Sequence, residues 1–298
     1  MRKVKIITDS CADLSADLLE KYSIDYVKMS IVEDGKESPA LLTWSPQDAH
    51  RLYDAIRRGK RITTAQVSVE EFNTVFKKYL DEGYDIVYIG CSSKQSGTVN
   101  TGHVTAQKLL SEYPGALIYC IDSLNACIGE GMLAIEAAKL VEAGHDADDI
   151  NKRILAIRKN VNQFVTVHTL EYFKRAGRVS ASAAFFGNLM GVKPILIADV
   201  NGVQTAIKKV KGRQSSFEEI VKCLKERITD PENQTVYIAH ADCSKEEQDI
   251  LVSLVKKEIP CKDIYVGFIG PIIGASIGPD AIGVWGFGKT VTHKAEEK

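Results

Sequence analysis

The sequence predicts an α/β protein of two domains, and three observations lead to that expectation. The chain has 298 residues, which at roughly 100–200 residues per domain favours two domains over one. Apolar runs alternate with helical patterns through the first half, the order typical of a parallel sheet covered by helices. The second half mixes hairpin signals with helices. We expect an N-terminal parallel-sheet α/β domain over residues 1–160 and a C-terminal α+β domain over 161–298.

The first half is expected to contain four strands and six helices. The apolar strand candidates are residues 4–8, 24–32, 84–90 and 116–122. The helical patterns are residues 16–22, 50–59, 71–83, 105–113, 132–144 and 146–161. Ser45 before Pro46 and the capping-box spacing at Ser68 each predict a helix start. Asp34-Gly35 predicts a hairpin turn.

The second half begins again with a strand at 164–169 and a short helix at 171–177. Asn201-Gly202, between the apolar runs 194–200 and 203–209, is its strongest hairpin signal. Helices and strands then alternate. The remaining candidates are helices at 215–228 and 244–258 and strands at 235–241, 263–269 and 282–288.

Composition and charge exclude several classes of protein. Lys and Arg number 38 against 39 Asp and Glu, a formal net charge of −1, which argues against a nucleic-acid binder. No apolar stretch is long enough to span a membrane, and the run after Met1 is too short for a signal peptide. We expect a cytoplasmic protein with no nucleic-acid partner and no integral membrane segment.

The cysteines and histidines give no sign of a disulfide framework, a metal site or a cofactor. The seven cysteines are scattered and form no CxxC pair, which is typical of free thiols in a reducing cytosol. The six histidines show neither HxxxH nor HxH spacing. We therefore expect no metal ion and no cofactor.

Hydroxyl side chains follow several predicted strands, most densely in the segment CSSKQSGTVNTG, residues 91–102. Each could simply cap a helix. Together, Ser96-Gly97-Thr98 at a helix start offers hydroxyls, N–H groups and the positive end of a helix dipole, which is an anion site. The chain has no P-loop, no GxGxxG after its first strand and no GxSxG elbow. His103 follows Ser96 by nearly two turns, ~10 Å at 1.5 Å per residue. This pattern favours holding an anion over breaking a bond, and no catalytic residue is expected.

Two segments of the second half suggest further roles. Residues 168–196 mix small residues with large apolar ones, which is typical either of a domain core or of the wall of an apolar tunnel. The tunnel candidates are Phe185, Phe186, Leu189 and Met190. Residues 207–213 carry four cations, which form either a solvated face or a contact for an acidic partner or a phosphate. These are Lys208, Lys209, Lys211 and Arg213.

Several separated motifs, in order, resemble the DegV family of bacterial fatty-acid-binding proteins over nearly the whole chain. They are IITDSCADLS, TAQVSVEEF, CSSKQSGTVNT, IDSLNACIGEG, HTLEYFKRAGRVS with GNLMGVKPIL, and GPIIGASIGPDAIG. The resemblance implies two domains with one long-chain fatty acid between them and the acyl chain in a closed apolar tunnel. It implies that the carboxylate meets hydroxyls in the interdomain cleft. The residues carried over are Thr64 with Thr63, Ser96 with Gly97, and Ser276.

The resemblance also implies a role. Some members deliver the fatty acid to a separate fatty acid kinase, whose acyl phosphate enters phospholipid synthesis. This chain would then be a monomeric carrier without chemistry of its own, and its basic segment would face the kinase or the phosphate.

The chain departs from the family pattern at the last glycine motif. Ser276 stands where the family usually has His, and Asp280 replaces a glycine. A serine can hydrogen-bond but cannot carry a positive charge. Lys211 stands where Arg is common, and Lys cannot make the same bidentate phosphate contact.

Two other functions are compatible with the same residues. One is an enzyme acting on a small anionic or acyl ligand with Ser96 as nucleophile, approached in three dimensions by His168 or His240. The other is a sensor whose domains move when a smaller anion binds at the Ser96 loop.

Overall fold

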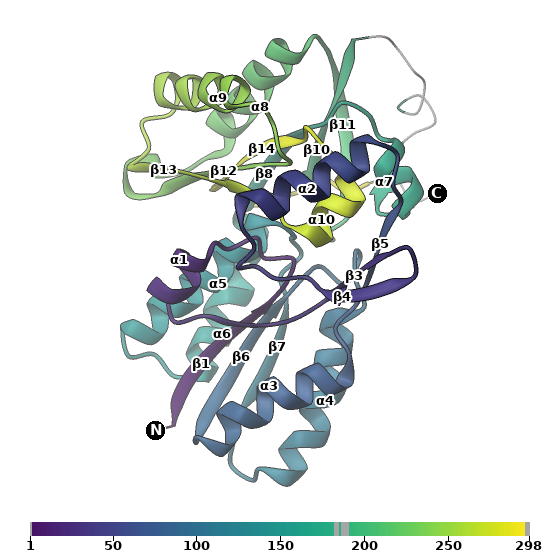
Figure 1. Cartoon of the computed structure of the whole chain (residues 1–298). Helices are drawn as coiled ribbons and strands as arrows, with labels where there is room; N and C mark the ends of the chain where they lie inside the picture. The colour runs from purple at the N-terminus through teal and green to yellow at the C-terminus, as the bar shows by residue number, and fades with distance from the viewer. Residues whose placement is uncertain (1, 182–184, 186–190, 296–298) are drawn as a thin grey trace. The chain divides into compact units, whose positions relative to one another are not determined.

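A computed structural model of the chain describes residues 2–181, 185 and 191–295. Its contacts divide the chain into two compact units (Figure 1). The first unit comprises residues 1–43 and 64–158, and the second comprises residues 44–63 and 159–298.

A parallel sheet forms the centre of the first unit. In the described residues it has four strands in the order β2–β1–β6–β7: β1 (Lys3–Asp9), β2 (Asp25–Val27), β6 (Tyr84–Gly90) and β7 (Ile118–Asp122). Two pairs of helices cover its opposite faces (Figure 1). One pair is α3 (Val69–Asp81) with α4 (Thr98–Glu112), and the other is α5 (Ile128–Glu142) with α6 (Ala147–Ile157). The short helix α1 (Ala16–Lys21) follows β1.

A small sheet accompanies the parallel one, in the order β4–β3–β5. Its strands are β3 (Ser30–Glu33), β4 (Lys36–Pro39) and β5 (Ile62–Ala65). The hairpin predicted at Asp34-Gly35 is confirmed, since β3 and β4 pair antiparallel and both turn residues have positive φ, 52° and 76°. This is the backbone of a type I′ turn.

The single strand predicted over residues 24–32 is wrong. β2 ends at Val27 and β3 begins at Ser30, in different sheets. Met29 lies between them, 3% exposed, and its N–H donates to Ser10 Oγ at 3.0 Å. The Ser10 hydroxyl in turn donates to the carbonyl of Ala40. The hydrogen bond from Met29 to Ser10 thus lies between two strands that the apolar pattern alone predicts as one.

The predicted helix starts are confirmed. At α2 (Pro46–Arg57), Ser45 Oγ accepts from the Asp48 N–H while Asp48 accepts from the Ser45 N–H, a complete capping box. At α3, Ser68 Oγ accepts from the Glu71 N–H at 3.1 Å. Such caps replace the hydrogen bonds that a helix start lacks.

A mixed sheet organises the second unit. In its described part the order is β13–β12–β14–β8–β10–β11–β9. The strands are β8 (Val161–Thr166), β9 (Val179–Ser180), β10 (Val192–Ala198), β11 (Gln204–Lys211), β12 (Thr235–His240), β13 (Asp263–Phe268) and β14 (Ile282–Phe287). The hairpin predicted at Asn201-Gly202 joins β10 to β11, with Gly202 at φ 82°.

Helices cover both faces of this sheet. The first pair is α8 (Arg213–Arg227) and α9 (Lys245–Glu258), whose buried side chains, such as Phe217 and Leu251, form one apolar cluster with Ile238 and Val284 of the sheet. Figure 1 shows α2 on the other side, together with α7 (Glu171–Ala176) and α10 (Pro271–Ile277). Short 3₁₀ turns occur at Arg158–Asn160 and Pro231–Asn233.

The division by contacts differs from the expected 1–160 and 161–298 in one segment. Residues 44–63, which carry α2, group with the second unit. Tyr53 is fully buried and its hydroxyl donates to the Ile269 carbonyl at 2.6 Å. Arg57 reaches Asp242 and Asp280. These contacts hold α2 against residues more than 180 positions further along the chain.

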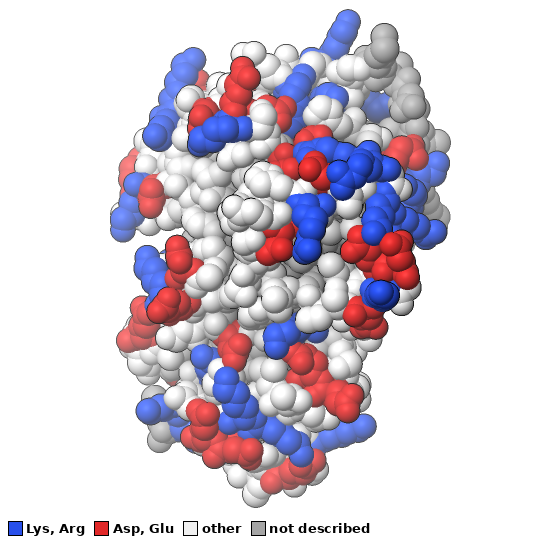
Figure 2. All heavy atoms as spheres, in the orientation of Figure 1, with Lys and Arg blue, Asp and Glu red and all other residues white. Residues whose placement is uncertain are grey.

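The distribution of charge on one face and the apolar character of the described helices agree with the composition of the chain. On the face shown in Figure 2, Lys and Arg are interspersed with Asp and Glu rather than gathered in one region. Within the described residues, no helix has both the length and the apolar composition needed to cross a bilayer. All seven cysteines lie in the described part and are free.

Candidate functional site

The start of α4 has the features of an anion site that the sequence predicts. Gly97 is the N-cap and makes no side-chain hydrogen bond, and the first turn carries no acidic residue. The positive end of the helix dipole is therefore not balanced by an acid of its own helix. Ser96 is half-buried beside it.

Ser96 is oriented by a short chain of hydrogen bonds within the first unit. The Val67 N–H donates to Thr98 Oγ1 at 3.3 Å. Thr98 Oγ1 lies 2.8 Å from Ser96 Oγ, which also accepts from the Thr98 N–H at 3.2 Å. When the Thr98 hydroxyl donates to Ser96 Oγ, the Ser96 hydroxyl can donate its own hydrogen to another acceptor. The arrangement suits a hydroxyl that donates to an anion.

The segment after β5 contacts the start of α4. Gln66 Nε2 donates to Thr101 Oγ1 at 3.0 Å. A Cβ added to Gly97 would lie 2.2 Å from Gln66 Oε1. Thr63 and Thr64, at the end of β5, are both exposed. The TAQ and SGT motifs are therefore neighbours in the fold, although about 30 residues separate them in the sequence.

Ser276 lies in the second unit, half-buried on α10. Gly278 is the C-cap of this helix and has a φ of 80°. A Cβ added to Gly278 would lie 2.2 Å from a ring carbon of Tyr172. Only glycine fits both conditions. This accounts for one glycine of the 267–288 segment by close packing.

Of the predicted tunnel residues, only Phe185 can be placed. It is half-buried, and Lys209 Nζ lies 5.5 Å from its ring centroid. Phe186, Leu189 and Met190 lie outside the described residues, so the predicted tunnel wall stays a prediction.

The four predicted basic residues do not share one environment. Lys208 is exposed and pairs with Glu219 of α8 at 2.8 Å. Lys209 contacts Phe185, and Lys211 is exposed at the end of β11. Arg213 turns inward at the start of α8, where its side chain is 16% exposed.

Arg213 makes several contacts but keeps one nitrogen without a partner. Its Nε donates to Glu247 Oε1 at 2.8 Å, and its Nη2 donates to the Asp280 carbonyl at 2.6 Å. Its Nη1 is buried and has no hydrogen-bond partner among the described residues. A buried guanidinium nitrogen of this kind can still bind an acceptor from a ligand.

Two further basic side chains, His168 and Lys193, lie near Arg213; the sequence names His168 only as a possible base and does not name Lys193. Lys193 Nζ lies 3.0 Å from His168 Nδ1. Burial, together with the charges of Arg213 and Lys193, holds the pKa of His168 below its usual value. Burial and Arg213 likewise lower the pKa of Lys193. An anion at this position would relieve the mutual repulsion of Arg213 and Lys193. His168 stands at a strand end, a weak signal, while nothing in the sequence singles out Lys193.

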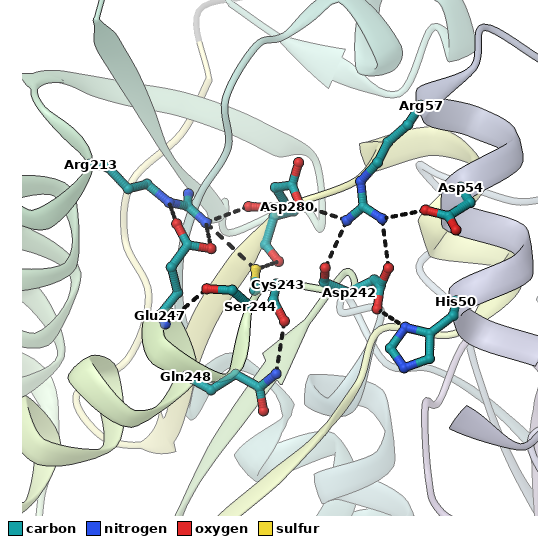
Figure 3. Close-up of polar contacts among 11 residues, drawn as sticks. His50, Asp54, Arg57, Arg213, Asp242, Cys243, Ser244, Glu247, Gln248 and Asp280 are labelled. Atoms are coloured by element: carbon teal, nitrogen blue, oxygen red, sulfur yellow. Dashed lines mark hydrogen bonds and ion pairs between the residues drawn. The ribbon is translucent and has the colours of Figure 1, made fainter. Parts of the chain in front are cut away.

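A second polar network joins α2 to the loop after β12 (Figure 3). Arg57 donates to Asp242 Oδ2 and to Asp280 Oδ1, both at 2.7 Å. His50 Nδ1 also contacts Asp242. His50, Asp242 and His240 line a pocket with the start of α9. Asp280 thus pairs with Arg57 in this chain.

The geometry does not favour Ser96 as a nucleophile. A serine nucleophile needs a base within hydrogen-bond reach. The polar side chain that contacts Ser96 Oγ is that of Thr98. His168 and His240, the bases considered from the sequence, contact Lys193 and Phe268 in the second unit.

Comparison with known proteins yields a consistent set of relatives. A family model described as "Uncharacterised protein, DegV family" matches residues 3–288. A DegV domain-containing protein of Clostridium perfringens is 33% identical over 290 residues, covering 97% of this chain and 99% of the relative.

Two solved structures extend the comparison. A DegV lipid-binding protein from Thermotoga maritima is 27% identical with a TM-score of 0.83, covering 97% of this chain and 100% of that one. A DegV family protein from Thermus thermophilus, described as binding fatty acid, is 25% identical with a TM-score of 0.86 and the same coverage.

Proposed function

Because the chain belongs to the DegV family, we propose that it binds a long-chain fatty acid and presents it to a separate fatty acid kinase in the cytoplasm. The family and the fold class predicted from the sequence are both confirmed. The observation that carries the proposal is the start of α4. There, an oriented serine hydroxyl and a helix dipole that no acid of the first turn balances are available to a carboxylate.

In this proposal the carboxylate accepts hydrogen bonds from the hydroxyls of Ser96, Thr64 and Thr63, close to the N–H of Gly97. Ser276 would supply a further hydroxyl, at the position where the resemblance leads us to expect histidine. Neutral donors orient the carboxylate and supply little of the affinity, because each exchanges hydrogen bonds with water for hydrogen bonds with the protein. Nothing here requires proton transfer or a metal ion.

The acyl chain supplies most of the binding free energy. At ~0.8 kcal/mol for each buried CH₂, a sixteen-carbon chain contributes on the order of 10 kcal/mol before the costs of ordering it. The proposed wall includes Phe185, together with Phe186, Leu189 and Met190. The position of the ligand between two domains, and the monomeric state, stay predictions.

The kinase or the transferred phosphate would meet the cations near β11. We include Lys209, Lys211 and Arg213 in this contact, with Lys193 as an addition. Lys208 would contribute its positive charge and no direct contact, because its ammonium group already pairs with Glu219. Arg213 offers Nη1 to a phosphate oxygen while Glu247 fixes its plane.

The first experiment is mass spectrometry of an organic extract from the purified, denatured protein. We expect near-stoichiometric long-chain fatty acid. Delipidated protein should also take up added palmitate or oleate. An extract without lipid, combined with no uptake by stripped protein, would remove the proposal.

The head-group assignment is tested by variants. The double substitution Ser96→Ala/Thr64→Ala is expected to weaken fatty-acid binding by roughly ten-fold, since each lost hydrogen bond costs about 0.5–1.5 kcal/mol. Ser111→Ala is the matched control, because Ser111 lies on the same helix and its hydroxyl only donates to the Lys108 carbonyl. Equal affinity of the double variant and the control would show that the carboxylate binds elsewhere.

Gly97→Ala tests the neighbouring contact. The new methyl group would displace the side-chain carbonyl of Gln66, which lies 2.2 Å away. Since Gln66 can rotate, we expect a loss of unfolding free energy below about 1 kcal/mol but several-fold weaker fatty-acid binding. Denaturant unfolding and ligand titration on the same preparation separate the two effects. A large loss of stability with unchanged affinity would contradict this expectation.

A further inference from the structure

Two buried cysteines and a buried glutamate meet in the first unit, at a place that the proposed lipid function does not use. One sulfur each from Cys11 and Cys91 and one carboxylate oxygen of Glu130 all lie within 4.8 Å of one another. All three residues are almost fully buried, at 1%, 1% and 0% exposed. Cys11 and Cys91 follow the adjacent parallel strands β1 and β6, whose carboxyl ends meet at one sheet edge.

One carboxylate holds the two cysteines side by side. Asp9 Oδ1 accepts from the backbone N–H of Cys11 at 2.8 Å. Asp9 Oδ2 accepts from the backbone N–H of Cys91 at 3.0 Å and from the Tyr88 hydroxyl at 2.7 Å. Asp9 is itself 0% exposed. Both sulfurs are therefore positioned by a rigid element, as a preorganised binding site requires.

A hydrogen bond orients the Glu130 side chain through one of its two carboxyl oxygens. Its Oε1 lies 2.8 Å from the hydroxyl of Thr8 on β1. Its Oε2 is buried and has no hydrogen-bond partner among the described residues. A buried carboxylate oxygen without a partner is costly unless something else binds it. The next residue, Gly131, lets α5 approach closely, since a Cβ there would lie 2.5 Å from the Ala12 carbonyl oxygen.

The surroundings favour a cation of soft character. An acidic side chain lies beside the cluster, since the Asp9 carboxylate accepts from the backbone N–H groups of Cys11 and Cys91. A third sulfur is also close, because Met29 Sδ lies 3.4 Å from Cys11 Sγ. Thiolates and carboxylates bind Zn²⁺, and thiolates with a thioether bind Cu⁺.

We propose that Cys11, Cys91 and Glu130 form a binding site for a closed-shell thiophilic metal ion, Zn²⁺ or Cu⁺. Two thiolates on a tetrahedral Zn²⁺ stand about 3.8 Å apart at Zn–S bonds of about 2.3 Å, and the ligand atoms of the cluster all lie within 4.8 Å of one another. Asp9 and Thr8 act as positioning residues that fix the ligands. The role is separate from fatty-acid binding, and it revises the expectation of no metal drawn from the scattered cysteines.

The test is metal titration of the full-length protein under anaerobic, reducing conditions. The protein is first freed of metal with a chelator and then titrated with Zn²⁺ or Cu⁺ against a competing chromophoric chelator. We expect one equivalent of at least one of these ions to bind. A parallel sample refolded in the presence of the ion excludes slow entry into the buried site as a cause of no binding.

Ligand variants identify the site and the ion. Cys11→Ser and Cys91→Ser should each weaken binding by about a hundred-fold, while Cys120→Ser, a buried cysteine outside the cluster, should not. Glu130→Gln should weaken Zn²⁺ binding alone, and Met29→Leu should weaken Cu⁺ binding alone. Far-UV circular dichroism checks that each variant is folded.

Co²⁺ provides a second readout, which reports the number of ligating thiolates when the ion is saturating. When thiolates ligate this ion, an intense charge-transfer absorption appears, and it should be reduced in Cys11→Ser, lost in Cys11→Ser/Cys91→Ser and kept in Cys120→Ser. Less than a tenth of an equivalent of both Zn²⁺ and Cu⁺ in the titrated and refolded samples would overturn the proposal. Unchanged binding in both cysteine variants would overturn it equally.

Discussion

Replacing Arg57 with methionine is expected to lower the free energy of unfolding of the second unit by about 2–3 kcal/mol. The guanidinium of Arg57 donates to Asp242 and to Asp280, both at 2.7 Å (Figure 3). The Asp242 side chain is only 7% exposed, so removing its partner leaves a buried carboxylate largely uncompensated. The effect stays below that of a fully buried pair because Arg57 is 32% exposed and His50 also contacts Asp242.

Tryptophan fluorescence measures this change selectively. The chain has two tryptophans, Trp44 and Trp285, and both belong to the second unit. Denaturant unfolding followed at these residues therefore reports the unit that contains Arg57. Arg51→Met is the control, since Arg51 lies on the same helix, is 80% exposed and pairs with its exposed neighbour Asp48. If the two variants unfolded at the same denaturant concentration, the network would contribute no more than a surface ion pair.

Acidification from pH 7 to pH 4 is expected to destabilise the second unit through His240 by about 3 kcal/mol. His240 is 4% exposed and packs against Phe268 with ring centroids 4.6 Å apart. Its Nδ1 is buried and has no hydrogen-bond partner within the described part of the chain. Burial lowers its pKa to about 4, against an ordinary value of 6.5. The neutral ring is therefore the form that the fold accommodates.

The sign of the effect follows from where the proton binds. Between pH 6.5 and about 4, the unfolded chain protonates His240 and the folded chain does not. The stability that is present above pH 6.5 is therefore lost as the pH falls through this window. His240→Gln should flatten this part of the stability curve, whereas His103→Gln should not, because His103 is exposed on α4. Parallel curves for the His240→Gln variant and the native protein between pH 7 and pH 4 would contradict the assignment.

Local features of this fold could be predicted from the sequence because their causes are local. The capping box at Ser45 depends on a residue three positions away, and the hairpin at Asp34-Gly35 depends on two residues with positive φ. The alternation of apolar runs and helical patterns predicts the parallel sheet of the first unit. The helix start at Ser96-Gly97 also follows from its place between a strand and a helix.

Contacts between residues far apart in the sequence determine where helix α2 packs and how Arg213 is oriented. Helix α2 groups with the second unit because Tyr53 and Arg57 find partners more than 180 residues away. Arg213 does not lie on an exposed basic surface with Lys208 and Lys211, because its guanidinium donates to Glu247 and to the Asp280 carbonyl. No pattern within a short window contains these pairings.

The sequence by itself determined the family and the fold class, since both depend on motifs or on periodicity within a few turns of chain. Only the tertiary structure brought Cys11 beside Cys91, eighty positions later. The physical reason is that adjacent parallel strands end at the same sheet edge, where the Asp9 carboxylate accepts the N–H groups of both cysteines. Scattered cysteines in the sequence thus become one cluster in the fold.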